Sequence, residues 1–294
     1  MNIRFEYLKL DNGITLHTAL NGSGQPILFV HGFPEFWYEW RGQLEAFSAD
    51  HLCIAPDLRG FNLSDKPPRV EDYRARKVVE DLRLLLRALD QGPAIVVAHD
   101  WGGAAAWGLA ALHPECVKKL VIINSPHPVV FARELRDNPA QRQASEYMNL
   151  FRSEKAERVM SEDNCRRMLR MSVEQWGGNG GDASPAVRAA YLASWMVPGA
   201  LTGALNYYRA SRLYPRKSGE PPIEVDEKFP LLSMPVLVIW GERDEFLLTG
   251  NLDGLDAYAK DLKIERIPDA SHWVVHERPQ QVNDLIRAFM HRAT

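Results

Sequence analysis

Three features that would point away from an ordinary globular enzyme are scarce in this sequence. The 294 residues contain three cysteines, Cys53, Cys116 and Cys165, which are too few and too scattered for a disulfide framework or a metal site. No apolar run approaches the length of a membrane span, and the first residues lack the charged-then-apolar layout of a secretory signal. The formal net charge of -3 gives no reason to expect nucleic acid or an anionic membrane as a partner. We therefore expect a cytoplasmic protein without a bound metal.

The sequence does contain β-branched apolar segments that alternate with helical patterns. Hydrophobic residues make up 46% and charged residues 25% of the chain, as in soluble globular proteins. This alternation predicts a parallel sheet with helices on both faces, and Asp11-Asn12-Gly13 predicts the turn of a preceding hairpin. The predicted strands are 3–10, 14–20, 27–30, 52–56, 94–97, 117–123, 234–240 and 262–268, and the predicted helices of the sheet layer include 36–47, 73–89 and 282–291.

The segment 125–229 has a different character. It contains no convincing β-branched strand, but several amphipathic helical pieces rich in Arg, Met, Tyr and Trp. Because sheet elements bracket it on both sides, we predict a core domain formed by 1–124 and 230–294, into which 125–229 is inserted as a helical lid. The alternative is a separate helical domain.

The stretch 94–107 carries the strongest functional signal. A buried apolar strand runs into Ala98-His99-Asp100-Trp101-Gly102, and an alanine-rich helix follows at once. A strand that turns directly into a helix strains the central residue, and its neighbours must be small for the chain to pass. This pattern predicts a nucleophile elbow with Asp100 as the nucleophile.

The identity of the residue at the elbow narrows the reaction. A serine that attacks a saturated carbon would leave an ether, which water does not readily reopen. A carboxylate leaves an ester, whose carbonyl carbon water can attack. Asp100 therefore indicates displacement at a saturated carbon, as in epoxide opening or carbon–halogen cleavage. The alternatives are an inactive relative of the fold or an aspartate that only caps the helix.

Hydrolysis of such an ester requires a base that works near neutral pH and an acid that orients it. His272 follows the last predicted strand, and Asp244 follows the strand before it. The order of nucleophile, acid and histidine is the one that hydrolases with a nucleophile elbow use. Asp244 is preferred over Glu242 and Glu245 because of its spacing from the strand.

The negative charge that develops during ester hydrolysis requires hydrogen-bond donors. The backbone N–H groups of Phe33, after the His31-Gly32 turn, and of Trp101, directly after the nucleophile, are the predicted oxyanion hole. His31 and His99 are interpreted as structural residues.

Together these residues resemble the soluble epoxide hydrolases of the α/β-hydrolase fold. The resemblance covers nearly the whole chain, and it implies a mostly parallel eight-stranded sheet with helices on both faces and an inserted helical lid. The sequence departs from the family pattern at Asn62, where relatives usually carry glycine, but asparagine also tolerates a left-handed backbone. The motifs that carry the resemblance are His31-Gly32-Phe33-Pro34-Glu35, Asp57-Leu58-Arg59-Gly60, His99-Asp100-Trp101-Gly102-Gly103, Trp240-Gly241-Glu242-Arg243-Asp244 and Ser271-His272-Trp273.

The resemblance also implies two tyrosines of the lid as acids that hydrogen-bond the epoxide oxygen. The matching positions are Tyr147 and Tyr208, with Tyr207 as the rival of Tyr208. An alkoxide leaves poorly unless it is protonated or strongly hydrogen-bonded, which is why the reaction needs such donors. The alternative for each tyrosine is packing within the lid. Phe33 and Trp101 are expected to line the substrate site together with the two tyrosines.

The implied function is hydrolysis of a small apolar epoxide to a vicinal diol, with no cofactor and with a homodimer as a candidate assembly. A haloalkane dehalogenase is the nearest alternative, but its second halide donor is commonly an asparagine where this chain has Phe33. A haloacetate dehalogenase would place arginines where Trp101 and Ala104 stand. The third alternative is a receptor on the same fold that binds a ligand without turning it over.

Overall fold

One mixed sheet organises the molecule. The computed structural model describes residues 2–224 and 228–292, and among them the sheet has eight strands in the order β1-β2-β4-β3-β5-β6-β7-β8. β2 is antiparallel to both β1 and β4, whereas the pairs from β4 to β8 are parallel. The predicted fold class is confirmed. The strands are β1 (Arg4–Lys9), β2 (Thr15–Asn21), β3 (Gln25–Val30), β4 (His51–Pro56), β5 (Ala94–His99), β6 (Val117–Ile123), β7 (Val236–Gly241) and β8 (Leu262–Ile267).

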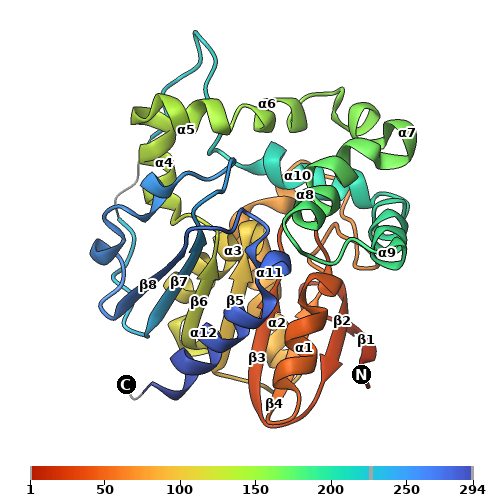
Figure 1. The fold of residues 1–294 in the computed structure, drawn as a ribbon, viewed down its shortest axis with the longest axis vertical. Coiled ribbons are helices and arrows are strands. Elements are labelled where there is room, and N and C mark those ends of the chain that lie inside the picture. The colour runs from red at the N-terminus through yellow and green to blue at the C-terminus, as the bar shows by residue number, and fades with distance from the viewer. Residues whose placement is uncertain (1, 225–227, 293–294) are drawn as a thin grey trace.

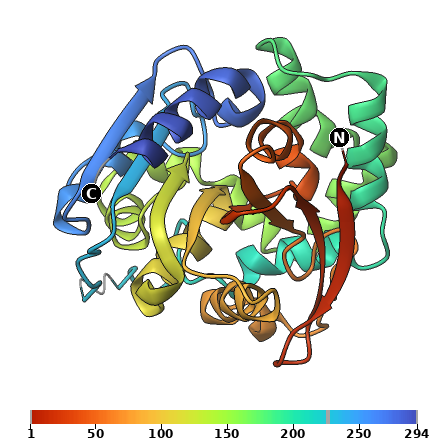
Figure 2. The same ribbon diagram turned by 90° about the horizontal axis from the view of Figure 1, so that it is seen from below.

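The N-terminal hairpin forms one edge of the sheet, at the red end of the chain in Figures 1 and 2. Leu10 donates its N–H to the Ile14 carbonyl at 2.7 Å, and Gly13 turns the chain with a φ of 86°. Glycine reaches this left-handed conformation at no steric cost. The predicted hairpin is therefore confirmed, and β8 lies at the opposite edge of the sheet.

Helices cover both faces of the sheet, as Figure 2 shows from below. α1 (Arg41–Phe47) and α12 (Pro279–His291) pack on one face, and α2 (Ala75–Ala88) and α3 (Asp100–Leu112) on the other. Neighbouring side chains of β5 enter opposite cores: Val96 joins the core under α2 and α3, and Val97 joins the core under α1 and α12. A strand buried on both faces explains why its sequence is continuously apolar.

One predicted helix is shorter than expected. Residues 36–47 form a 3₁₀ turn, Trp37–Trp40, followed by α1. The Trp37 N–H donates to the Asp57 carboxylate at 2.9 Å, so this end of the segment is anchored to the loop after β4. The apolar spacing that predicted one helix instead reflects two short helical pieces that bury Trp40, Leu44 and Phe47 on the same face of the sheet.

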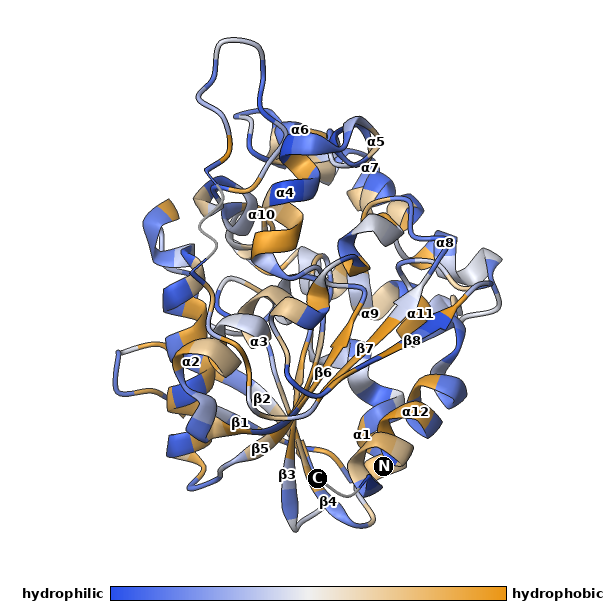
Figure 3. Cartoon of the chain, turned by 90° about the vertical axis from the view of Figure 1, so that its left-hand side faces the viewer, coloured by the Kyte–Doolittle hydropathy of each residue, from blue (hydrophilic) through white to orange (hydrophobic). Residues whose placement is uncertain are grey.

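Helices make up most of the described residues between β6 and β7, as far as residue 210. They lie over one end of the sheet in Figure 1, and Figure 3 shows that hydrophobic and hydrophilic residues alternate along them, whereas the central strands are mostly hydrophobic. We call the segment from α4 to α10 the insertion. Its proposed limits at 125 and 229 stay a prediction, and 225–227 lie outside the described residues. The helices are α4 (Pro128–Asp137), α5 (Pro139–Ala144), α6 (Tyr147–Phe151), α7 (Ala156–Met171), α8 (Val173–Gly178), α9 (Pro185–Trp195) and α10 (Ala200–Ala210), and α11 (Val274–Glu277) follows β8.

The parallel strands place their carboxyl ends beneath the insertion, which is where ligands bind in sheets of this kind. The loops after β3, β5, β6, β7 and β8 all meet there. In the described part of the chain, no helix is both long enough and apolar enough to cross a membrane.

Candidate active site

Asp100 stands at the turn between β5 and α3, in a left-handed conformation with a φ of 48°. The backbone can adopt this turn because glycines surround it. A Cβ at Gly32 would lie 2.3 Å from the Cβ of Asp100, and a Cβ at Gly102 would lie 2.2 Å from the Val30 carbonyl oxygen. The small residues in the motif are therefore required by close contact between chain segments.

The carboxylate of Asp100 faces the loop after β3. The Phe33 N–H donates to its Oδ1 at 2.7 Å, and the Ser125 hydroxyl donates to its backbone carbonyl at 2.6 Å. Trp101 follows in the first turn of α3, where backbone N–H groups have no acceptor within the helix. The Phe33 N–H thus contacts the carboxylate directly, whereas the role of the Trp101 N–H as a second oxyanion donor stays a prediction.

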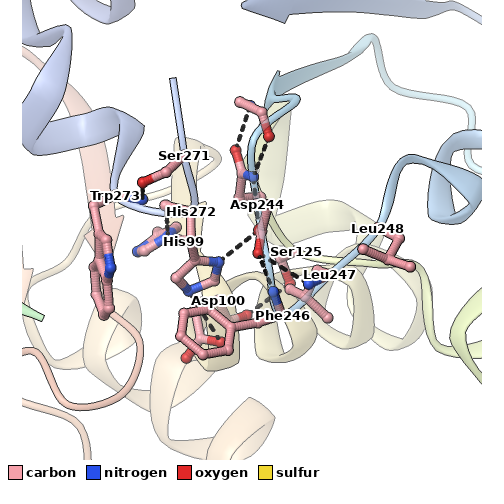
Figure 4. A network of polar contacts seen from close by, with 12 residues as sticks. His99, Asp100, Ser125, Asp244, Phe246, Leu247, Leu248, Ser271, His272 and Trp273 are labelled. Atoms are coloured by element: carbon pink, nitrogen blue, oxygen red, sulfur yellow. Dashed lines mark hydrogen bonds and ion pairs between the residues drawn. The ribbon is translucent and has the colours of Figure 1, made fainter. Parts of the chain in front are cut away.

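His272 lies between two carboxylates, as Figure 4 shows. Its Nδ1 is 2.7 Å from Asp244 Oδ2, and its Nε2 is 3.8 Å from Asp100 Oδ2. Asp244 and His272 are each only 4% exposed. Because the carboxylate of Asp244 accepts the Nδ1 proton, the lone pair of Nε2 points toward Asp100.

Asp244 is itself fixed by three donors, drawn as dashed lines in Figure 4. The N–H groups of Phe246 and Leu247 donate to Oδ1 at 2.8 and 2.9 Å, and the Asn124 amide donates to Oδ2 at 2.8 Å. Asn124 in turn accepts the Gly241 N–H at 2.7 Å. Asn124 directly follows β6 with a φ of 35°, and no sequence pattern pointed to its contact with Asp244.

The two acidic neighbours of Asp244 point elsewhere. Glu242 forms an ion pair with Arg266 at 3.0 Å, and Glu245 is exposed. Among these three acidic residues, Asp244 is the one that contacts His272.

The insertion brings Tyr147 and Tyr208 above Asp100. Tyr147 begins α6, and Tyr208 lies in α10. Their ring centroids are 6.1 Å apart, and Tyr208 packs edge-on against Phe33 and Trp101, each at 5.1 Å. Tyr207 instead donates its hydroxyl to the Arg59 carbonyl at 3.0 Å, which leaves Tyr208 as the member of the pair that reaches the site.

Burial raises the pKa of the Tyr147 hydroxyl, and the nearby Asp100 carboxylate raises it further. Burial likewise raises the pKa of Tyr208 well above its ordinary value, with Tyr147 and Asp100 adding to the effect. An ionised phenol would lose its hydration in this apolar position and stand close to a carboxylate. Both hydroxyls therefore stay protonated near neutral pH and are available as hydrogen-bond donors.

A cavity with two arms surrounds these groups. The larger arm is lined by apolar residues that include Phe131, Met148 and Leu213. The smaller arm is lined by Phe33, Met171, Phe246, His272 and Trp273. Asp100, Tyr147 and Tyr208 line both arms and so lie where the arms meet.

Two histidines near the site make structural contacts. His31 Nε2 accepts the Leu58 N–H at 2.9 Å, while its Nδ1 contacts the Gly32 carbonyl at 2.9 Å. Burial lowers the pKa of His31, which keeps the ring neutral. His99 Nε2 lies 3.0 Å from the His272 carbonyl oxygen.

One group of potential metal ligands occurs among the described residues. Ligand atoms of Glu35, Glu39 and His276 lie within 4.8 Å of one another in the buried interior. Glu35 already accepts the Tyr191 hydroxyl on one carboxylate oxygen, and His276 Nε2 lies 3.3 Å from the other. This group is separate from the residues that line the cavity around Asp100.

Comparison with known proteins assigns the class. Residues 25–279 match the family described as the α/β hydrolase fold. The chain is 34% identical to epoxide hydrolase 2 of Caenorhabditis elegans, over 98% of this chain and 80% of that protein. It is 37% identical to an α/β-hydrolase superfamily protein of Bacillus subtilis, over 95% of each chain. A crystal structure of a Bacillus megaterium epoxide hydrolase with an inhibitor superposes with a TM-score of 0.91 at 36% identity, covering 98% of this chain and all of the other.

The chain therefore belongs to the α/β-hydrolase fold family, and it is a hydrolase. Within that family it belongs to the group that contains these epoxide hydrolases. The predicted recognition is confirmed.

Proposed function

We propose that this protein is an epoxide hydrolase that converts an apolar epoxide to a vicinal diol through a covalent ester on Asp100. One observation supports this above others. The carboxylate of Asp100, the imidazole of His272 and the side chains of Tyr147 and Tyr208 line one cavity. A nucleophile, a base and two acids for the departing oxygen thus meet around a single space.

In the first step, the epoxide oxygen accepts hydrogen bonds from Tyr147 and Tyr208 while an Asp100 oxygen attacks a ring carbon. The carbon–oxygen bond of the strained ring breaks, and the alkoxide takes a proton from a tyrosine hydroxyl. The high pKa of both phenols supports this role, because the proton is present at neutral pH.

In the second step, His272 removes a proton from water, and the resulting hydroxide attacks the carbonyl carbon of the Asp100 ester. The oxyanion accepts hydrogen bonds from the N–H groups of Phe33 and Trp101. The Phe33 N–H already lies 2.7 Å from Asp100 Oδ1. Collapse of the intermediate breaks the bond between the carbonyl carbon and the diol oxygen and regenerates the Asp100 carboxylate. Of the two protons of the water, one passes from His272 to the leaving diol oxygen, and the other restores the tyrosine hydroxyl that was deprotonated in the first step. Asp244 stabilises the imidazolium of His272 until its proton is transferred.

The insertion serves in this proposal as a lid that covers the substrate. The apolar lining of the larger arm favours substrates with hydrocarbon substituents over charged ones. This chemistry requires no cofactor from outside the chain. The homodimer and the cytoplasmic location stay predictions.

A dehalogenase would use the same nucleophile but would need donors for a halide. The side chain of Trp101 is the candidate donor, and its ring packs edge-on against Tyr208. Phe33 stands where the second donor would be expected, and its ring packs against Tyr208. The contacts of these two side chains favour the epoxide over the halide.

Single-turnover hydrolysis of styrene oxide in ¹⁸O-labelled water, with enzyme in excess, tests the proposal. We expect one labelled oxygen in the Asp100 carboxylate, found by mass spectrometry of the peptide, and an unlabelled first diol. A labelled first diol with unlabelled Asp100 would instead show direct attack by water and would overturn the ester route.

The same preparation is assayed against a haloalkane and haloacetate. Halide release without diol formation would identify a dehalogenase. Tight binding of an epoxide without any turnover, retained in Asp100→Asn, would identify a receptor. We expect diol formation to exceed halide release.

A further inference from the structure

A buried glutamine of the insertion holds the loop that follows β7. Gln141 lies in α5, and its side chain is fully buried. Its Nε2 donates to the Phe246 carbonyl and to the Ser145 hydroxyl, each at 2.8 Å. Its Oε1 accepts the Leu248 N–H at 2.9 Å and the Asn251 amide at 2.7 Å. The glutamine lines neither arm of the cavity, and the proposed mechanism does not use it.

These four contacts use the whole hydrogen-bonding capacity of the amide. A side-chain amide has two N–H donors and an oxygen that accepts two hydrogen bonds. The backbone partners fix which end faces which, because the Phe246 carbonyl only accepts and the Leu248 N–H only donates. The amide of Gln141 is therefore held in one orientation, with every donor and acceptor paired.

The loop that Gln141 holds is the one that fixes the orienting acid. The Phe246 and Leu247 N–H groups donate to Asp244 Oδ1 at 2.8 and 2.9 Å. The other oxygen of this carboxylate lies 2.7 Å from His272 Nδ1. Figure 4 shows the loop residues beside the acid and the base. A displacement of the loop would therefore move the carboxylate that orients His272.

The same glutamine holds the segment that leads into Tyr147. Ser145, whose hydroxyl accepts from Gln141, follows α5 and stands two residues before Tyr147. The Tyr147 ring packs edge-on against Phe246 with centroids 5.3 Å apart. Phe246 in turn packs edge-on against His272 at 5.4 Å. Gln141 thus contacts both segments that carry the reacting side chains, one from the insertion and one from the sheet.

We propose that Gln141 is a positioning residue: it ties the loop after Asp244 to the insertion, and so fixes where the base and the tyrosine acid stand relative to each other. Without the amide, the backbone groups that it holds would be buried and unpaired, and the loop would move to pair them. The inference rests on the proposed function, in which Tyr147 acts in ring opening and His272 in ester hydrolysis.

Two substitutions test the role of the amide. Gln141→Met keeps the length of the side chain and removes all four hydrogen bonds. Gln141→Asn keeps the amide but is one methylene shorter, so it cannot make the same four contacts. Gln143→Met, at an exposed position of the same helix, is the matched control.

Pre-steady-state kinetics with styrene oxide give the first readout. In Gln141→Met we expect ring opening and ester hydrolysis each to be slower by about tenfold, because a small displacement of a catalytic group has a large effect on rate. Gln143→Met should carry out both steps at the parent rates. Parent rates for both steps in Gln141→Met would overturn the inference. If Gln141→Met does not fold, Gln141→Asn takes its place, with the same expected and contradicting results.

A double-mutant cycle separates positioning from a general loss of structure. If Gln141 acts on ring opening through Tyr147, its loss should matter little once the Tyr147 hydroxyl has been removed. In a Tyr147→Phe background we therefore expect Gln141→Met to slow ring opening by less than about twofold. A further loss of about tenfold in that background would show that the two residues act independently, and it would overturn the inference.

A spectroscopic readout needs no turnover and so separates failure of this inference from failure of the proposed function. The proton between His272 Nδ1 and Asp244 should give a far-downfield proton NMR resonance that is absent from His272→Gln. This resonance should be shifted or broadened in Gln141→Met and unchanged in Gln143→Met. An unchanged resonance in Gln141→Met would overturn the inference, even in an active epoxide hydrolase. A shifted resonance in a protein that turns over no epoxide would support the role of Gln141 and refute only the proposed function.

Discussion

The sheet side and the insertion side of the cavity hold their functional groups by different forces. On the sheet side, Asp100, Asp244 and His272 are fixed by hydrogen bonds of 2.7 to 2.9 Å to one another or to nearby amides. On the insertion side, Tyr147 and Tyr208 are held mainly by ring packing.

This difference matters because the two sides supply different groups in the proposed reaction: the sheet side supplies the nucleophile and the base, and the insertion side supplies the donors to the epoxide oxygen. Hydrogen bonds fix direction closely, which ester hydrolysis requires of its base and oxyanion donors. Ring packing excludes water and tolerates small adjustments. We therefore expect substitutions on the sheet side to abolish or stall the reaction, and substitutions on the insertion side to slow ring opening.

The largest effect is expected from Asp100→Asn, which removes the nucleophile but keeps the shape of the side chain. Diol formation should fall by about 10⁴-fold or more, as for other enzymes that lose a nucleophile. The assay is diol release from styrene oxide, with mass spectrometry to confirm that the asparagine is intact. Residual activity near the parent level would show that another group attacks the epoxide.

His272→Gln should stall the reaction after its first step. Without the base, ester formation proceeds and hydrolysis slows by about 10³-fold or more. Intact-protein mass spectrometry should then show the protein plus one substrate. Unmodified protein under the same conditions would contradict the assignment of His272 to the second step alone.

Tyr208→Phe and Tyr147→Phe should each slow ring opening while leaving hydrolysis of the ester unchanged. A hydrogen bond to a developing alkoxide contributes about 1.5 to 3 kcal/mol, or about 10- to 100-fold in rate. Tyr207→Phe is the matched control, since its hydroxyl binds the Arg59 carbonyl. An equal loss of ring-opening rate in all three variants would indicate packing and not proton donation.

The smallest effect concerns stability at acid pH. His127 caps α4 through its Nδ1, and burial lowers its pKa to about 3. In the unfolded chain the imidazole of His127 binds a proton below about pH 6.5, whereas in the folded chain it does not. The contribution to stability is therefore full at neutral pH and falls as the pH decreases toward 3. The slope is at most about 1.4 kcal/mol per pH unit.

His127→Asn keeps a capping acceptor and removes the titration. Its free energy of unfolding, from urea titrations, should vary less between about pH 6.5 and pH 4 than that of the parent. A parallel loss in both proteins would mean that other groups dominate acid unfolding.

The sheet and its loops could be predicted because short-range rules govern them. Ala98 and Gly102 around Asp100 reveal a tight strand-to-helix turn, and the order of the strands places His272 at the same edge. The spacing that selected Asp244 agrees with its burial beside His272.

Contacts between distant segments could not be predicted in the same way. Asn124 reaches Asp244 across 120 positions, and Glu39 reaches His99 from another element. Tyr207 and Tyr208 are adjacent, and only the orientation of α10 decides which one enters the cavity. No local sequence pattern predicts these side-chain contacts, because each contact depends on how whole helices and strands pack against one another.

The glycine at position 32 has a consequence for how this enzyme can diversify. A side chain there would collide with the carboxylate of Asp100. Substitutions at this position of the loop would therefore displace the nucleophile, so the position cannot vary. Met148 and Leu213 line the larger arm. The steric restriction at position 32 does not apply to these two residues. New substrate ranges should therefore arise through exchange of those bordering residues, while the chemistry beneath them is inherited unaltered.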